Sequence, residues 1–295
     1  MSGQRHFLSR REFLRNAAIA AATIGSGTSV LRSLLSRQMP GVAYAAPSVG
    51  KFEERYASSW KTWVLGSAGE IRLPPPTSTT SPQINTELAR LQRAQRERTE
   101  AQITAARYWD TGPATRRWTE IQLDMIKTHR PNPPRASRGL ALAHIAMYDA
   151  LIAAWHFKYL FNYPAPSGVD PTLTSVVRSS DSPSYPSEHS VVAGAAARVL
   201  EYLFPQQGSG WFEAKAQEAA MSRIWAGIDW PNAVEQGMAL GRMVADKVLA
   251  RAKTDRSDTV WDGKRHAGIC YWKPTPPAAV FPPLEPSWGK VNPWL

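Results

Sequence analysis

The segment from Ser137 to about Phe157 constrains the fold most, because apolar side chains cover almost every face of the helix that it predicts. A helix of this kind must be buried, either in a protein core or in a membrane. His144 and Asp149 lie inside the segment and favour a soluble core, where we expect both to be satisfied polar groups rather than ligands. The rest of the chain must therefore supply helices that cover this one.

Helical periodicity continues on both sides of this segment, and no run of useful length alternates as a β-strand would. One amphipathic helix begins near Asn85, and a second carries Trp118 to Ile126 before a group of prolines. Ser187 can cap a later helix, and Pro231 favours the first turn of the last one. The helices predicted after the central segment span about 187–203, 211–225 and 232–253. We therefore expect an all-α helical bundle.

Two irregular arms rich in Pro and Trp flank the predicted helices. Trp60 and Trp63 are the expected docking points of the first arm, and the run of prolines at 74–76 favours extended backbone. The second arm holds four Trp residues, which we expect to pack on the core rather than to form a binding face. The predicted division is a leader at 1–45, an N-terminal arm at 46–84, a helical domain at 85–253 and a C-terminal arm at 254–295.

Composition and charge exclude several classes of protein. With 43% hydrophobic residues, the chain of 295 residues can bury a sizeable core, which excludes a disordered chain. The formal net charge is +11, but six Arg against one Glu in residues 1–45 leave a remainder without the basic stripe that nucleic acid requires. Nucleic acid is therefore not an expected partner. The single cysteine, Cys270, can form no internal disulfide, and we expect it to be buried as a small hydrophobe.

The first 45 residues have the features of an export signal. Arg10 and Arg11 precede an uncharged, Ala-rich stretch from Ala17 to Leu31, and Ala43-Tyr44-Ala45 offers small residues for cleavage. This pattern resembles a twin-arginine signal, which a receptor reads as an address, and its apolar stretch is short for a membrane span of ~20 residues. We therefore expect a soluble protein that the twin-arginine machinery exports to the periplasm or the cell exterior, with no stable membrane insertion.

Three short segments in a fixed order carry the chemistry of the predicted helical domain. They are Lys158 with the Pro-containing loop after it, Pro186-Ser187-Glu188-His189, and Ser222-Arg223 followed by Asp229. Their order and spacing are similar to those of the superfamily of type 2 phosphatidic acid phosphatases and vanadium-dependent haloperoxidases, whose pattern is K-x6-R-P, P-S-G-H and S-R-x5-H-x3-D. The resemblance covers roughly residues 85–252. Each segment alone is a weak match, but three in order on a helical pattern make a strong one.

The resemblance implies the helical fold of that superfamily and a site for a tetrahedral oxyanion, either phosphate or vanadate. In the family, a Lys, two Arg and Ser or backbone donors hold the anion, one His attacks phosphorus or ligates vanadium, and a second His is the general acid. Carried over to this chain, Lys158, Ser187 and Arg223 are expected to bind phosphate. His189 is expected to be the general acid.

Four positions depart from the family pattern. The strict spacing puts Ala165-Pro166 where Arg-Pro belongs, so one family Arg is missing. Glu188 replaces the Gly of P-S-G-H, and Asp229 stands in place of the attacking His. Ala233 replaces the Asp that would orient that His. The machinery of the site is therefore expected to be altered.

The departures leave three interpretations open. In the first, the protein is a variant phosphomonoester hydrolase, in which Asp229 is the nucleophile or general base, beside Glu188, and His189 protonates the leaving group. The second is a noncatalytic descendant with a structural or binding role, because the two predicted cations and the two predicted acids sum to about zero charge and can form ion pairs. The third is metal binding by Glu188, His189 and Asp229, which the nearby cations oppose.

Vanadate is the cofactor that the resemblance implies for the haloperoxidases. Asp229 would deprive vanadium of its apical nitrogen ligand, so vanadate and haloperoxidase chemistry remain the disfavoured alternative, and we predict no other cofactor and no metal ligands. If the protein is an enzyme, we expect a phosphatase-like hydrolase that acts on a small phosphate ester. The sequence does not position loops such as 164–182, which would set its specificity.

Overall fold

The computed structural model describes residues 56–274 and 283–294. The chain divides into two units, Met1–Tyr44 and Ala45–Leu295, and every described residue belongs to the second. The predicted leader therefore lies outside the described residues. The α-helices of the described part are α3 (Ile84–Glu97), α4 (Glu100–Trp109), α5 (Arg116–His129), α6 (Pro133–Phe161), α7 (Glu188–Leu203), α8 (Trp211–Ala226) and α9 (Pro231–Ala252). This part contains no β-strand, so the prediction of an all-α fold is confirmed.

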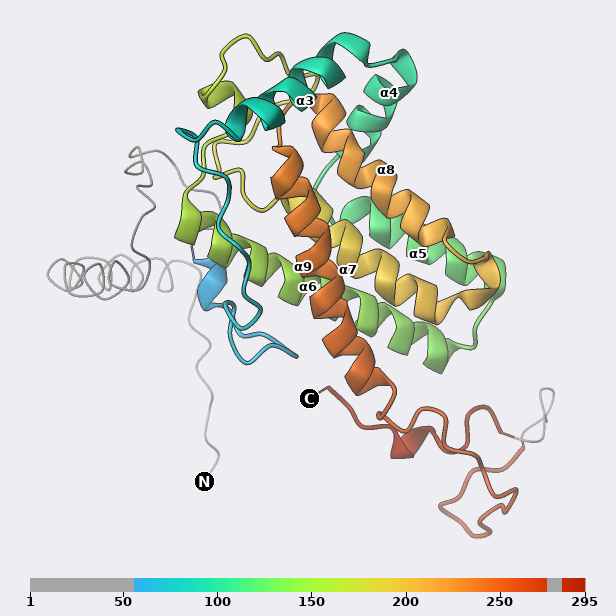
Figure 1. Cartoon of the computed structure of the whole chain (residues 1–295). Coiled ribbons are helices and arrows are strands. Elements are labelled where there is room, and N and C mark those ends of the chain that lie inside the picture. The colour runs from blue at the N-terminus through green and yellow to red at the C-terminus, as the bar shows by residue number, and fades with distance from the viewer. Residues whose placement is uncertain (1–55, 275–282, 295) are drawn as a thin grey trace, which may run out of the picture. The chain divides into compact units, whose positions relative to one another are not determined.

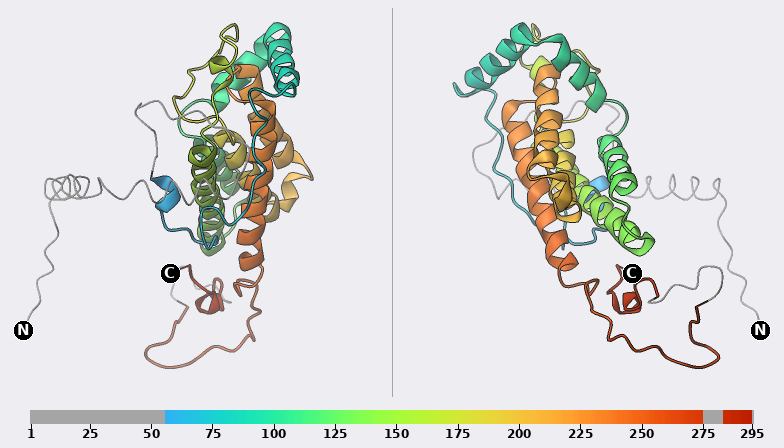
Figure 2. Two further views of the ribbon diagram at one scale, coloured as in Figure 1. Left: turned by 60° about the vertical axis from the view of Figure 1, so that its left-hand side comes forward. Right: turned by 90° about the vertical axis from the view of Figure 1, so that its right-hand side faces the viewer.

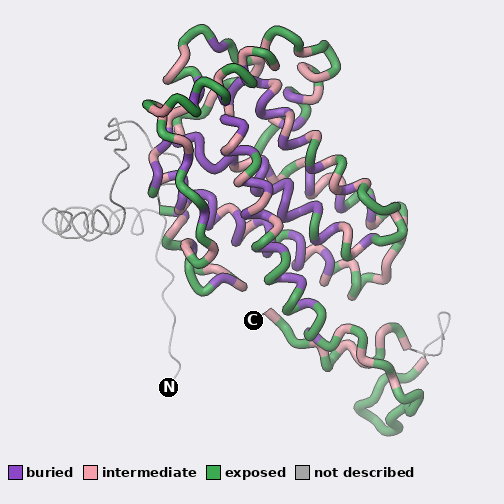
Figure 3. Tube along the Cα trace, viewed as in Figure 1, coloured by how far each residue is buried: buried purple, intermediate pink, exposed green. Residues whose placement is uncertain are grey.

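The core of the bundle is built around α7, which packs against α6, α8 and α9 (Figure 1). Figure 3 shows that buried residues concentrate on these helices. α7 and α9 approach each other at glycines, because a Cβ added at Gly194 would overlap the backbone of Met238 and one at Gly241 the backbone of Val191. The bundle is therefore held together at its centre by backbone-to-backbone packing.

α6 is the predicted apolar helix, and it starts earlier than predicted. Asn132 caps it by accepting the backbone N–H of Arg135 at 3.1 Å, and Pro133 and Pro134 occupy its first turn. These prolines were expected to end the preceding helix, but proline is equally suited to the first positions of the next one. By length and composition α6 could cross a membrane, a test that core helices also pass, and 61% of its apolar window is buried inside the protein.

Asp149 on α6 anchors the N-terminal arm. The carboxylate is fully buried and accepts the backbone N–H groups of residues 63–65 at 2.8 to 3.1 Å. Trp60 stacks on Tyr148 with ring centroids 6.5 Å apart, which docks the arm on the same helix. His144 is exposed, so the expectation that it lies in the core was wrong, while Asp149 is the satisfied core group that we expected.

The amphipathic segment near Asn85 forms two helices rather than one. Thr99 begins α4 with a capping box, in which Thr99 and Gln102 exchange hydrogen bonds between side chain and backbone. The break lets α3 and α4 cover one end of the bundle, beside the loop that joins α6 to α7 (Figures 1 and 2). This end of the bundle carries the candidate site.

The C-terminal arm lies largely in solvent. None of its described residues beyond Asp255 is buried, and Cys270 is exposed, which contradicts the prediction of a buried cysteine. Two of its Trp rings contact Arg side chains of the bundle, since Trp288 lies 5.8 Å from the Arg135 guanidinium and Trp294 lies 4.1 Å from that of Arg251. Trp272 remains 48% exposed. The arm contributes contacts to the bundle rather than core.

Candidate active site

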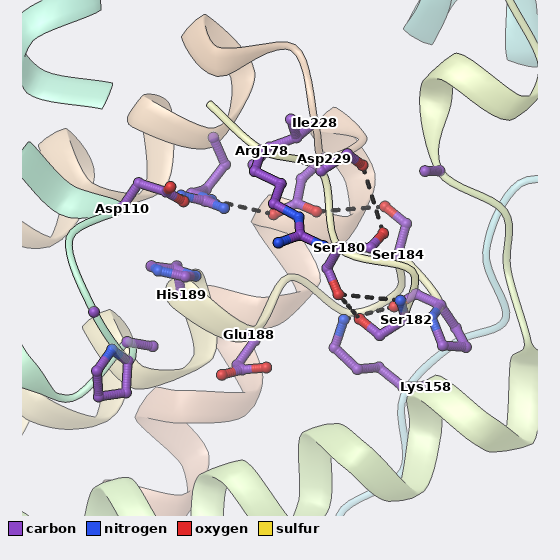
Figure 4. Close-up of a pocket in the computed structure, with 17 residues that line it drawn as sticks. Asp110, Lys158, Arg178, Ser180, Ser182, Ser184, Glu188, His189, Ile228 and Asp229 are labelled. Atoms are coloured by element: carbon purple, nitrogen blue, oxygen red, sulfur yellow. Dashed lines mark hydrogen bonds and ion pairs between the residues drawn. The ribbon is translucent and has the colours of Figure 1, made fainter. Parts of the chain in front are cut away.

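A cavity of about 200 Å³ lies where the α6–α7 loop meets the α4–α5 and α8–α9 connections (Figure 4). α6 contributes its last turns to the wall, and α7 contributes its first. The ionisable side chains in the wall are Asp110, Lys158, Arg178, Glu188, His189, Arg223 and Asp229. Four loop serines also line it, namely Ser179, Ser180, Ser182 and Ser184. The cavity therefore offers charges and hydroxyl groups to a ligand.

Five of the six predicted site residues share this cavity, and Ser187 is the exception. Ser187 is fully buried behind the wall, and its hydroxyl donates to Asp229 Oδ2 at 2.7 Å. Its side chain makes no cap hydrogen bond to α7, although it precedes the helix as predicted. The geometry thus gives Ser187 the role of holding Asp229, not of contacting an anion.

Asp229 stands at the position where the family pattern has the attacking His. Its Oδ1 accepts a hydrogen bond from Ser184 Oγ at 3.4 Å, and its Oδ2 lies 3.6 Å from Arg223 Nε. The side chain is 14% exposed, which leaves it in contact with the cavity. A fixed carboxylate of this kind can act on a ligand as a nucleophile or a base.

Arg223 is buried and faces two acids. Its Nη1 donates to Asp110 Oδ1 at 2.9 Å, whereas its buried Nε has no hydrogen-bond partner in the structure. Asp110 is a site residue that sequence reasoning missed. The only signal for it was an acid at the end of a helix, just before the Gly112-Pro113 turn.

Lys158 reaches the cavity from the last turns of α6. Its ammonium group donates to the carbonyl oxygen of Pro183 at 2.6 Å and lies 5.5 Å from the ring centre of Trp155. The residue is only 4% exposed, so the charge sits at the base of the wall. Lys158 thereby ties the α6–α7 loop to the bundle and presents a cation to the same cavity.

His189 is the second group in the wall with an unpartnered buried atom. Its Nε2 is buried and has no hydrogen-bond partner in the structure. Burial lowers the pKa of His189 well below its usual value of 6.5, and the cations of Arg223 and Lys158 lower it further. The imidazole is therefore neutral at pH 7.

Glu188 and His189 are neighbours at the start of α7, and their side chains diverge (Figure 4). Among the described residues, no three His, Cys, Asp or Glu side chains come together in a way that could hold a metal ion. The interpretation of Glu188, His189 and Asp229 as a metal site therefore has no geometric support here.

Arg178 is the other ionisable residue of the wall that sequence reasoning missed. It lies on the α6–α7 loop, and its guanidinium group points into the cavity (Figure 4). With Arg178 and Asp110 included, three cations and three acids line the wall. The formal charge of the wall therefore remains zero, although more ionisable residues contribute to it than predicted. The sequence offered no signal for Arg178, because nothing in it places the 164–182 loop.

Comparison with known proteins identifies the fold. Residues 139–254 match the PAP2 superfamily, which confirms the resemblance predicted from the sequence. A bacterial vanadium-dependent iodoperoxidase superposes with a TM-score of 0.62 and 25% sequence identity, over 74% of this chain and 63% of its own. A bacterial vanadium-dependent chloroperoxidase superposes with a TM-score of 0.58 and 14% identity, over 70% of this chain and 58% of its own. No curated protein sequence matches the chain significantly.

The chain spans 63% of the length of the iodoperoxidase, so the activity of that protein is not carried over to it. Vanadate is the group that such relatives imply, and the residues of this cavity do not fit it. The position of the apical nitrogen ligand is taken by Asp229, whose anionic oxygens already accept hydrogen bonds from Ser184 and Ser187. A carboxylate there offers vanadium no neutral nitrogen ligand.

Proposed function

We propose that the protein is a phosphoester hydrolase that acts on a small phosphomonoester. The observation that carries the proposal is a pair of buried atoms without a hydrogen-bond partner, Arg223 Nε and His189 Nε2, in the wall of one cavity. A buried polar atom without a hydrogen-bond partner costs about 1–3 kcal/mol, and in the wall of a cavity a ligand can supply the missing partner. A phosphoryl group supplies acceptor oxygens for the Arg223 donor.

The residues of the cavity can catalyse the hydrolysis of a phosphomonoester in two steps. Asp229 attacks phosphorus, so that an Oδ–P bond forms while the ester P–O bond breaks. His189 gives a proton to the departing oxygen, and Lys158 and Arg223 stabilise the charge on the phosphoryl oxygens. Water then attacks phosphorus, His189 takes its proton, and release of phosphate restores Asp229.

His189 must carry a proton to act as the acid, and the protein alone disfavours that state. Besides burial, the cations of Arg223 and Lys158 lower its pKa. A bound phosphate dianion offsets these two charges and so raises the pKa of His189. The substrate thus helps to create the acid that its own cleavage requires.

The test is hydrolysis of two phosphomonoesters that differ in their need for an acid. An alkyl phosphate needs a proton on its leaving oxygen, whereas p-nitrophenyl phosphate releases a stable anion. We expect Asp229→Asn to reduce kcat on both by about 10³-fold or more. His189→Gln should reduce kcat by about 10²-fold on the alkyl ester and much less on the nitrophenyl ester.

Asp246→Asn is the matched control, because Asp246 is a carboxylate that pairs with Arg198 and does not line the cavity. It should leave both rates unchanged. Activity that survives Asp229→Asn and His189→Gln together would remove the hydrolase proposal.

A noncatalytic role is the second candidate, and the pairing of Arg223 favours it. Arg223 is held by Asp110 at 2.9 Å and by Asp229 at 3.6 Å, so a cation of the cavity is already partly neutralised. In that case the wild-type protein hydrolyses neither ester, while Asp229→Asn lowers the melting temperature, because it leaves a buried guanidinium without one of its acids.

We also propose that the protein is exported by the twin-arginine machinery. Support comes from the sequence of residues 1–45 alone, in which Arg10 and Arg11 precede an uncharged stretch and a small-residue cleavage site. A small ester outside the cytoplasm is then the expected substrate, with neither nucleic acid nor a membrane as a stable partner.

A further inference from the structure

Arg178 differs from the other two cations of the cavity wall in having no bound acceptor. Lys158 donates to the Pro183 carbonyl and Arg223 to Asp110, whereas no described residue forms an ion pair or hydrogen bond with Arg178. The side chain is exposed at the loop and points into the cavity (Figure 4). Its five N–H donors are thus available to an incoming anion.

The formal charge of the cavity wall makes the free donors of Arg178 important for anion binding. Without Arg178, two cations face the three acids Asp110, Glu188 and Asp229, and the wall carries a formal charge of −1 that repels a phosphate. Opposite charges at short range attract each other more strongly in a partly buried wall than in water. The unpaired guanidinium of Arg178 therefore brings the formal charge of the wall to zero and favours phosphate binding.

The loop that carries Arg178 is fixed to the bundle directly before this residue. Val176 and Val177 pack on a small apolar cluster formed by Ala106, Ala226 and Ile228. The backbone N–H of Val176 also donates to the carbonyl of Ala226 at 3.2 Å. Two anchored residues thus precede Arg178 and set the point from which its side chain extends.

Gly227 allows the loop to lie this close to the end of α8. Its φ is +77°, and a Cβ at this position would stand 2.9 Å from the carbonyl oxygen of Thr174. Arg98 fastens the same contact, since it donates to the Trp225 carbonyl at 3.1 Å and to Thr174 Oγ1 at 3.2 Å. The placement of Arg178 is therefore built into the fold by residues distant in sequence.

We propose that Arg178 is the residue that captures the phosphoryl group in this cavity. It supplies the positive charge that is missing at Ala165, which lies in the wall of the same cavity. The inference rests on the proposed binding of a phosphoryl group, but its test measures anion binding rather than hydrolysis. The two proposals can thus fail separately.

The test is calorimetric titration of the purified full-length protein with inorganic phosphate. Arg178→Ala should weaken phosphate binding at least about tenfold, because the only unpaired cation is lost. Arg178→Lys should bind with intermediate affinity, because an ammonium keeps the charge but not the planar fork of donors. Arg107→Ala is the control, since Arg107 is exposed and lies outside the cavity, and it should bind like the wild type.

A second pair of variants tests the placement of the loop. Gly227→Ala should weaken phosphate binding because its Cβ pushes Thr174, and with it Arg178, away from α8. Gly210→Ala is matched to it, because its φ is +79° and its Cβ would meet nothing within 4 Å. Both variants carry the same backbone strain, but only the first should affect phosphate binding.

Equal phosphate affinity in Arg178→Ala and the wild type would overturn the inference, and so would a wild type that binds no phosphate at millimolar concentration. Phosphate binding that depends on Arg178, in a protein that cleaves no ester, supports the inference and refutes the hydrolase. Ester hydrolysis with an unchanged KM in Arg178→Ala refutes the inference and leaves the hydrolase standing.

Discussion

At the scale of single residues, the hydrogen-bond partners of buried polar groups distinguish structural residues from candidate functional residues. Asp149 is fully buried, yet three backbone N–H groups satisfy it, so its task is to hold the N-terminal arm. Arg223 Nε and His189 Nε2 are also buried, but neither has a hydrogen-bond partner. The difference lies in the surroundings, because Asp149 faces backbone donors whereas the other two line a cavity.

The depressed pKa of His189 predicts a dependence of stability on pH. The unfolded chain gains a proton on this residue near pH 6.5, whereas the folded protein resists protonation because the ring is buried beside cations. The unfolded state then binds more protons, so the free energy of unfolding should fall as the pH drops below 6.5, by at most about 1.4 kcal/mol per pH unit. Urea denaturation at about pH 7.5 and about pH 5.5 measures this.

His189→Gln should show a smaller loss of stability over the same interval. Part of the loss will remain, because burial also lowers the pKa of His156 and that residue acts in the same direction. Saturating phosphate should reduce the loss in the wild type, since a bound anion raises the pKa of His189. An identical pH dependence in the wild type and the variant would contradict the assignment to His189.

At the scale of elements, the contact between α7 and α9 sets the geometry of the site. Gly237 on α9 lies against the end of the loop, where a Cβ would stand 2.7 Å from the Ser187 carbonyl oxygen. The backbone N–H of Ser187 donates in turn to the carbonyl of Ala233 on α9 at 3.0 Å. The start of α7, which carries His189, is thus held directly on α9.

Gly241→Ala should test how much depends on this close approach. In an open helix, replacing Gly by Ala stabilises by about 1 kcal/mol. Here the new Cβ would overlap the Val191 backbone, so α7 and α9 must separate, and we expect a loss of about 3 kcal/mol. Denaturant midpoints measure the change. Gly289→Ala, whose Cβ meets nothing within 4 Å, is the control, and an equally small effect of both changes would refute the argument.

At the scale of the whole molecule, the folded bundle and the predicted leader concern where the protein folds and where it acts. The bundle brings Lys158, His189 and Asp229 together from three separate segments. Such a cavity exists only in the folded chain, and a twin-arginine system transports proteins after they have folded. The predicted leader therefore fits the proposal that the protein folds inside the cell and acts outside it.

Export has a direct test in a host that possesses the twin-arginine machinery. Replacing both Arg10 and Arg11 by Lys should retain the protein in the cytoplasm, because the receptor reads the pair of guanidinium groups and not charge alone. Fractionation followed by immunoblotting measures the distribution. Arg15→Lys is the control and should be exported normally. Export of the doubly substituted protein in undiminished amount would argue against this route.

The sequence by itself determined the all-α fold, and it singled out Lys158, Glu188, His189, Arg223 and Asp229, which line one cavity. The helices follow from local periodicity, which is a property of neighbouring residues. The break between α3 and α4 was missed, because the capping box at Thr99 competes with continued helix and both are locally plausible. Pro133 was misassigned for a similar reason, since proline can end one helix or begin another.

Only the tertiary structure decided the contents of the cavity. Ser187 does not line the cavity, because its hydroxyl donates to Asp229, a partner 42 residues away in sequence. Asp110 and Arg178 entered it because the α4–α5 connection and the anchored α6–α7 loop converge on the end of α8. The physical reason is that the position of a loop is set by the surfaces it packs against and not by its own conformational propensity. The charged residues that line the cavity can therefore be identified only from the folded structure.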